Sequence, residues 1–139
     1  MENFLYFRNV AAVADDDGIE NSVAYPVSAL IGMYPVSDTS IQLNFKNVQR
    51  PEGHGNSLVL DNAANLPLVD TVVLNIVDNK GLEAMQDLTF AMTTPIPNKY
   101  AGMIIVADDA ADSTGGTKYL TGNITSCGTI THNAAYVNA

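Results

Sequence analysis

Two acidic segments that open with the same four residues carry the side chains of this chain best suited to chemistry. VADDDGIEN runs from Val13 to Asn21, and VADDAAD runs from Val106 to Asp112. Grouped carboxylates could bind Ca²⁺, which prefers several oxygen ligands, or could act as a general acid and base. The alternative is a pair of structural turns, because Asp bonds to the backbone that follows it and often ends a strand.

The spacing of these acids departs from the known calcium-binding loop. That loop takes ligands from alternate positions, with Gly at the sixth position and Glu at the twelfth. Alternate positions from Asp15 give Asp17 and then Ile19, so the pattern fails. A non-standard structural Ca²⁺ site is kept as a hypothesis, with Asp15, Asp17, Asp108 and Asp109 as its candidate ligands. No other metal and no cofactor is expected.

The remaining reactive side chains lack the neighbours that catalysis needs. Cys127 is the only cysteine, which excludes an intrachain disulfide, and its strand-like run NITSCGTIT favours a small buried side chain. His54 and His132 are the only histidines, with no CxxC motif to suggest zinc. The sequence contains no GxSxG, P-loop or GxGxxG motif. We therefore predict that the protein is not an enzyme.

The composition is that of a globular domain with a polar surface that is mostly uncharged. Of the 139 residues, 47% are hydrophobic and 15% are charged, and the net charge is −9. We predict a single β-rich domain over residues 1–139. The six basic residues are scattered, so neither nucleic acid nor an anionic membrane is an expected partner. No signal peptide and no membrane span are expected either.

Alternation of apolar and polar residues predicts that most of the chain is β-strand. In TSIQLNFKNV the apolar side chains of Ile41, Leu43 and Phe45 share one face, which is typical of a strand with one buried side. SALIGMYP is interrupted by Gly32 and Pro35, which favours a buried turn or one helical turn. Further strands are expected over 4–7, 22–27, 57–62, 66–77 and 102–109, and a final strand or pair of strands over 119–132.

One segment changes from the strand period to the helix period. An amphipathic helix is predicted over Asp78–Thr94, with Asp78 as its N-cap and with prolines directly after it. Its apolar stripe comprises Leu82, Met85, Leu88 and Met92. The predicted fold class is therefore α+β and mainly β: an antiparallel or mixed sheet or sandwich with one amphipathic helix.

Three segments resemble the small structural proteins of tailed bacteriophages, particularly of marine cyanophage types. They are the opening FLYFRN, the run YPVSALIGMYPVSDTSIQLNF and the strand exit VADD. The resemblance implies a virion structural protein, most simply a capsid decoration or cement protein that carries no catalytic residues. It further implies that the chain is located in the virion, that it forms a homo-oligomer, and that it contacts other virion proteins such as the major capsid protein.

Aromatic residues near the expected strands are the candidate contacts for such an assembly. The interface candidates are Phe4, Tyr6, Phe7, Tyr25, Tyr34 and Tyr136.

Two other functions are kept as alternatives. The first is a component of a phage tail tube, sheath or fibre, with Asn47–Leu58 and Asp108–Tyr119 as the loops that would close a ring. The second is a small module that binds carbohydrate or a host surface, since exposed aromatic rings stack on sugars. The available rings are Tyr25, Tyr34, Tyr100 and Tyr119.

Overall fold

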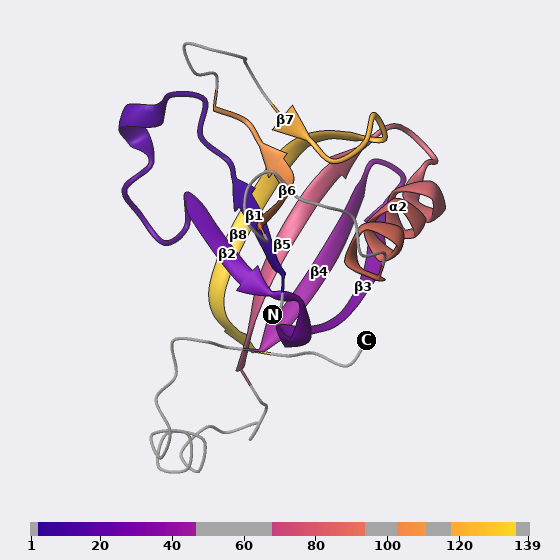
Figure 1. Ribbon diagram of the computed structural model, residues 1–139, viewed down its shortest axis with the longest axis horizontal. Helices are drawn as coiled ribbons and strands as arrows, with labels where there is room; N and C mark the ends of the chain where they lie inside the picture. Colours follow the sequence, from indigo (N-terminus) through magenta and orange to yellow (C-terminus); the bar gives the residue numbers. More distant parts are fainter. Residues whose placement is uncertain (1–2, 47–67, 94–102, 111–117, 136–139) are drawn as a thin grey trace.

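The computed structural model describes residues 3–46, 68–93, 103–110 and 118–135, which form eight strands, one α-helix and two short 3₁₀ turns (Figure 1). The elements in chain order are β1 (Phe4–Arg8), η1 (Val13–Asp15), β2 (Ser22–Pro26), η2 (Val27–Ala29), β3 (Leu30–Ser37), β4 (Ser40–Lys46), β5 (Leu68–Ile76), α2 (Gly81–Thr93), β6 (Met103–Asp108), β7 (Lys118–Tyr119) and β8 (Ile124–Ala135). This composition of elements confirms the predicted class, α+β and mainly β.

The strands form two four-stranded sheets. Sheet A has the order β2-β1-β6-β7, with β1 and β6 parallel and the other neighbours antiparallel. Sheet B has the order β3-β4-β5-β8 and is antiparallel throughout. The segment 119–132, predicted as one strand or a pair of strands, contributes to two: β7 belongs to sheet A and β8 to sheet B. The strand expected over 57–62 lies outside the described residues.

Each sheet turns one apolar face toward the space between them. In β4 the side chains of Ile41, Leu43 and Phe45 have no solvent exposure, as the alternating pattern predicts. Three aromatic rings join the two sheets: Tyr25 of sheet A stacks on Phe45 of sheet B with 4.2 Å between ring centroids, and Phe7 meets Phe45 edge-on. Such pairs add stabilisation beyond the apolar area that they bury.

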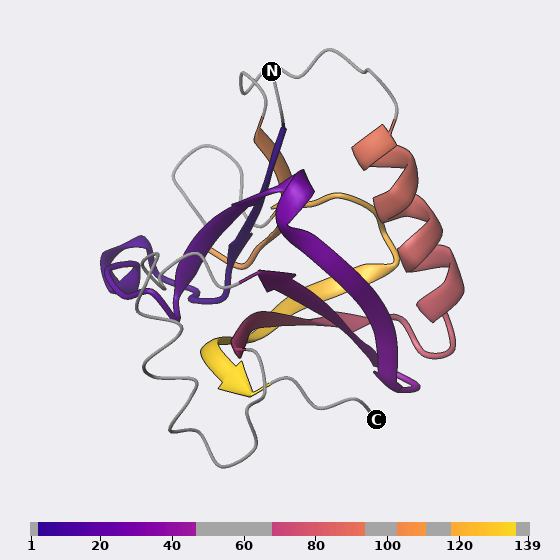
Figure 2. The same cartoon turned by 90° about the horizontal axis from the view of Figure 1, so that it is seen from below.

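The helix α2 covers the same core from the side (Figure 2). Ala84 and Leu88 are fully buried, and Met85 and Met92 pack against the core at its margin. Figure 1 shows α2 on one flank of the molecule and the loop that carries η1 on the opposite flank. This loop, residues 9–21, is called the acidic loop below. It and the helix lie on opposite sides of the molecule.

The start of the helix and one position of its stripe differ from the prediction. Asp78 is not the N-cap; it lies in a turn in which Lys80 N–H donates to the Val77 carbonyl, and Ala84 N–H bonds to the Lys80 carbonyl as the helix begins. Asn79 has a positive φ of 62°, a conformation that Asn tolerates better than most residues. Leu82 is 63% exposed, whereas Ala84 in the same turn has no exposure, so Leu82 lies on the face of the helix that points away from the core.

The segment SALIGMYP is also different from its prediction. Only Val27–Ala29 forms a helical turn, and the strand β3 follows directly. Pro35, which has no N–H to donate, is tolerated because β3 is at the edge of sheet B as the described residues form it, and Gly32 lies at a shift of register with β4. The register with β4 shifts on either side of the regular stretch, between Leu30 and Gly32 and between Pro35 and Ser37.

Candidate functional site

The two acidic segments meet at one end of sheet A, although they are far apart in the sequence. Because β1 and β6 are parallel, their C-terminal ends lie together, and Arg8 is in register with Asp108. Arg8 Nε and Nη2 donate to the two carboxylate oxygens of Asp108, each at 2.8 Å. The remaining nitrogen, Nη1, donates to Asp16 Oδ2 at 2.7 Å. One guanidinium thus bridges the two VADD segments.

The electrostatics of this cluster favour a permanent ion pair. The side chains of Arg8 and Asp108 are 15% and 6% exposed, so little water screens their attraction. The hydrogen bonding of Arg8 to the Asp108 carboxylate is the main cause that raises the pKa of Arg8 above its ordinary value. Asp108 also accepts the N–H of Ala110 at 3.0 Å. The place that a cation would take beside Asp108 is filled by a side chain of the protein itself.

The other calcium candidates are not gathered around a common point. Asp109 accepts the Tyr119 hydroxyl at 2.6 Å and the Cys127 backbone N–H at 2.9 Å, which ties β6 and β7 to β8. Asp15 and Asp17 lie exposed on the acidic loop. Among the described residues, no three His, Cys, Asp or Glu side chains are placed to hold a metal ion.

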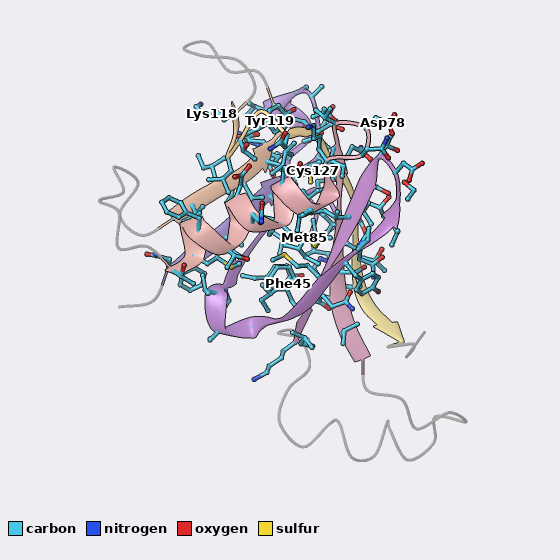
Figure 3. The ribbon with its side chains drawn as sticks, turned by 90° about the vertical axis from the view of Figure 1, so that its right-hand side faces the viewer. Phe45, Asp78, Met85, Lys118, Tyr119 and Cys127 are labelled. Carbon is cyan, nitrogen blue, oxygen red and sulfur yellow. The ribbon has the colours of Figure 1, made fainter. Side chains whose placement is uncertain are left out.

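Cys127 lies in this region but is kept unreactive. Figure 3 labels it behind α2, close to Tyr119. Burial, followed by the nearby charges of Asp109 and Asp108, raises the pKa of the thiol from 9.0 to about 12. Since the thiolate is the nucleophilic form, this position suits packing and not covalent chemistry.

A second polar cluster lies inside the core and joins the two sheets. Asp70 of β5 has no exposure, and its Oδ2 accepts the Tyr25 hydroxyl at 2.9 Å. The same oxygen lies 3.2 Å from Nδ1 of His132, whose Nε2 meets the Ile19 carbonyl at 2.5 Å. Burial and the bond to Asp70 raise the pKa of Tyr25 above its ordinary value. Sequence reasoning missed this cluster, although a lone Asp in the apolar run LPLVDTVVLNIV is a signal for a buried polar partner.

The interface candidates differ in whether they lie on the exposed face or the core-facing side of their strands. Phe4 and Tyr34 are 42% and 41% exposed, and Tyr6 is half-buried with its hydroxyl on Ser22. Phe7 and Tyr25 are a correction, because they occupy the core-facing positions of β1 and β2 and have no exposure. Tyr136 lies outside the described residues.

The most exposed apolar strand is β3, at the edge of sheet B. Ile31, Tyr34 and Val36 are 50%, 41% and 49% exposed, and the strand contains no charged residue. The hydroxyl of Tyr34 accepts a hydrogen bond from Gln42 Nε2 at 2.9 Å, which orients its ring. The sequence analysis names Tyr34 as an interface candidate but treats its strand as a buried turn or one helical turn.

Comparison with known proteins adds no relative: no family model, no curated protein and no solved structure matches the chain. Within the described residues no helix has the length and apolar character needed to cross a membrane.

Proposed function

We propose that this chain is a structural protein of a tailed-phage virion and serves as a capsid decoration or cement protein. In this role its copies contact one another and the major capsid protein, and the added contacts stabilise the shell by mass action. The observation that carries the proposal is the uncharged, partly apolar edge strand β3. The sequence resemblance to phage structural proteins supports it.

The strand β3 has the properties of an edge that contacts another chain. Its sequence, LIGMYPVS, has no charge, although the whole chain has a net charge of −9. Two acidic copies repel each other, so contact costs least where the surface carries no charge. An edge strand also presents backbone groups that a second strand can pair with.

Two features limit the length of β3 that can pair. Pro35 has no N–H to donate, and the register shifts interrupt the regular stretch at both ends. The contact is therefore expected to use the side chains of Ile31, Tyr34 and Val36 as well as the backbone. Such a contact is weak in dilute solution and effective on a lattice, where the local concentration is high.

Replacing Ile31 and Val36 together by lysine is expected to weaken self-association at least about tenfold, because two charges enter a contact that has none. Sedimentation velocity over a concentration series measures the change. Val13→Lys is the matched control: Val13 is as exposed as Ile31 but lies on the acidic loop, so this variant should associate like the wild type. A double-lysine variant that associates like the wild type would exclude β3 as the contact.

The location of the protein requires a separate measurement. Mass spectrometry of gradient-purified phage particles should find the chain in a fixed ratio to the major capsid protein. A ratio matching the tail proteins would favour the tail alternative instead. Absence from intact particles would contradict a virion role altogether.

Binding of carbohydrate is a second candidate, favoured by the exposed ring of Tyr34 and the partly exposed amide of Gln42 beside it. Gln42 donates to the Tyr34 hydroxyl and to the buried Asn44, so the ring is held in place for stacking on a sugar. Tyr34→Ala is expected to abolish binding on a glycan array while Tyr6→Phe preserves it. If the wild type binds no glycan at high concentration, this candidate is dismissed.

A further inference from the structure

The side chain of His132 lies between two hydrogen-bond acceptors. Its Nε2 is 2.5 Å from the Ile19 carbonyl oxygen, and its Nδ1 is 3.2 Å from Asp70 Oδ2. A carbonyl oxygen only accepts, so Nε2 must carry a hydrogen. The Asp70 oxygen already accepts the Tyr25 hydroxyl, and both side chains of the His–Asp pair are buried, at 7% and 0% exposure.

The number of hydrogens shared by the His132 ring and Asp70 decides whether their contact is attractive. In a neutral ring with its hydrogen on Nε2, Nδ1 carries only a lone pair, and that lone pair would face the carboxylate. The contact is attractive only if one more proton is present, either on Nδ1 as an imidazolium or on Asp70 as an acid that donates to Nδ1. Two facing lone pairs in a buried site are costly, because water cannot replace the missing bond.

We propose that this proton is a latch that holds the acidic loop, residues 9–21, against strand β8. With the proton in place, His132 bonds at once to the buried Asp70 and to the loop at Ile19. When the proton is lost, one of the two bonds must break. Asp70 is fixed in the core and the loop is at the surface, so the loop is the part that moves.

The rest of the loop has attachments that do not depend on this proton. Arg8 holds Asp16, and Asn9 Nδ2 donates to the carbonyls of Glu20 and Gly128, each at 3.0 Å. Opening is therefore local to the stretch around Ile19, which is itself 52% exposed. The exposed acids Asp17 and Glu20 stand on either side of Ile19, so opening changes how negative charge is presented at this flank.

The ionisable groups of the described residues that contact the latch enter the pH argument. Asp70 of β5 faces His132 directly, and Tyr25 of β2 faces it through the Asp70 oxygen. The pKa of Tyr25 and that of Cys127 are raised in the folded state, so folding favours their protonated forms. Both groups lower global stability as the pH rises toward strongly alkaline values. A test must therefore separate local opening from global unfolding.

Hydrogen exchange read by NMR makes this separation. The amides of Asn21 and Ser22 bond to the Gly18 carbonyl within the loop, and core amides of β4 and β5 report global opening. After correction for the intrinsic rate, protection at Asn21 and Ser22 is expected to fall at least about tenfold across the pH range in which the shared proton is lost, while core protection changes far less. Equal changes in loop and core would contradict a latch.

Asp70→Asn is the decisive variant. The two N–H groups of the new amide donate to His132 Nδ1 and to the Tyr25 hydroxyl oxygen, so the chain of bonds closes with a neutral ring. Loop protection in this variant should be independent of pH over the same range. A variant whose loop still opens like the wild type would overturn the proposal.

A measurement on the unmodified protein does not depend on whether that variant folds. The ¹⁵N shifts of the imidazole nitrogens distinguish the neutral ring from the charged ring and reveal a bond to a protonated carboxylic acid. His54 is the only other histidine, and His54→Asn provides the assignment. A loss of the shared proton that coincides with loop opening supports the latch. A neutral ring with an ionised Asp70 throughout the range would refute it. The proposal is independent of the virion role.

Discussion

Replacement of Arg8 by methionine is expected to lower the free energy of unfolding by about 3 kcal/mol, because it leaves a buried carboxylate without its cation. The Asp108 side chain is only 6% exposed and receives two of the three charged hydrogen bonds that Arg8 makes. Methionine retains most of the apolar stem, so the loss reports on charge and hydrogen bonding more than on packing. Equilibrium unfolding in urea measures the change.

A double-mutant cycle tests whether the two residues act as a pair. Asp108→Asn should cost a similar amount, and the variant with both changes should lose less than the sum, since no unpaired buried charge remains. Asp15→Asn is the matched control, because Asp15 is next to Asp16, which Arg8 binds, but is itself exposed, so its replacement should cost no more than about 0.5 kcal/mol. Additive losses in the double variant would contradict the coupling.

This pair also shows where sequence reasoning reaches its limit. The two VADD segments can be recognised in the sequence, which leaves open whether their acids bind Ca²⁺ or form structural turns. The ion that joins them is Arg8, which is 100 positions from Asp108. Their contact follows from the parallel pairing of β1 with β6, and no local pattern encodes which strands become neighbours. The charges of Arg8 and Asp108 can be read from the sequence, but the distance between the two side chains cannot.

Local patterns in the sequence predict burial well where buried and exposed side chains alternate along a strand. Alternation placed Ile41, Leu43 and Phe45 correctly in the core, because a strand exposes every second side chain. Aromatic content alone was a poor guide: Phe7 and Tyr25 were assigned to a surface that their strand parity does not reach. Which of the alternating side chains of β1 face the core can be decided only when the sheet that β1 joins is known.

Replacement of Gly128 by alanine is expected to cost about 2–3 kcal/mol, since the new methyl group has no space. A Cβ at this position would lie 2.8 Å from the backbone oxygen of Val73 and 3.3 Å from its Cγ1. The obstacle is therefore backbone in the neighbouring strand β5, which cannot rotate away as a side chain can. The melting temperature should fall by roughly 6–10 °C.

Two comparisons identify the cause of that loss. Gly32→Ala adds the same methyl group where no atom lies within 4 Å, so it should be neutral or slightly stabilising. Adding Val73→Ala to Gly128→Ala should give no rescue, because shortening the side chain leaves the backbone oxygen in place. Rescue by the second change would instead locate the clash at the valine side chain. An unchanged stability of Gly128→Ala would mean that β5 and β8 can move apart at the register shift between Val72 and Leu74, and that the sheet is locally softer than its close packing implies.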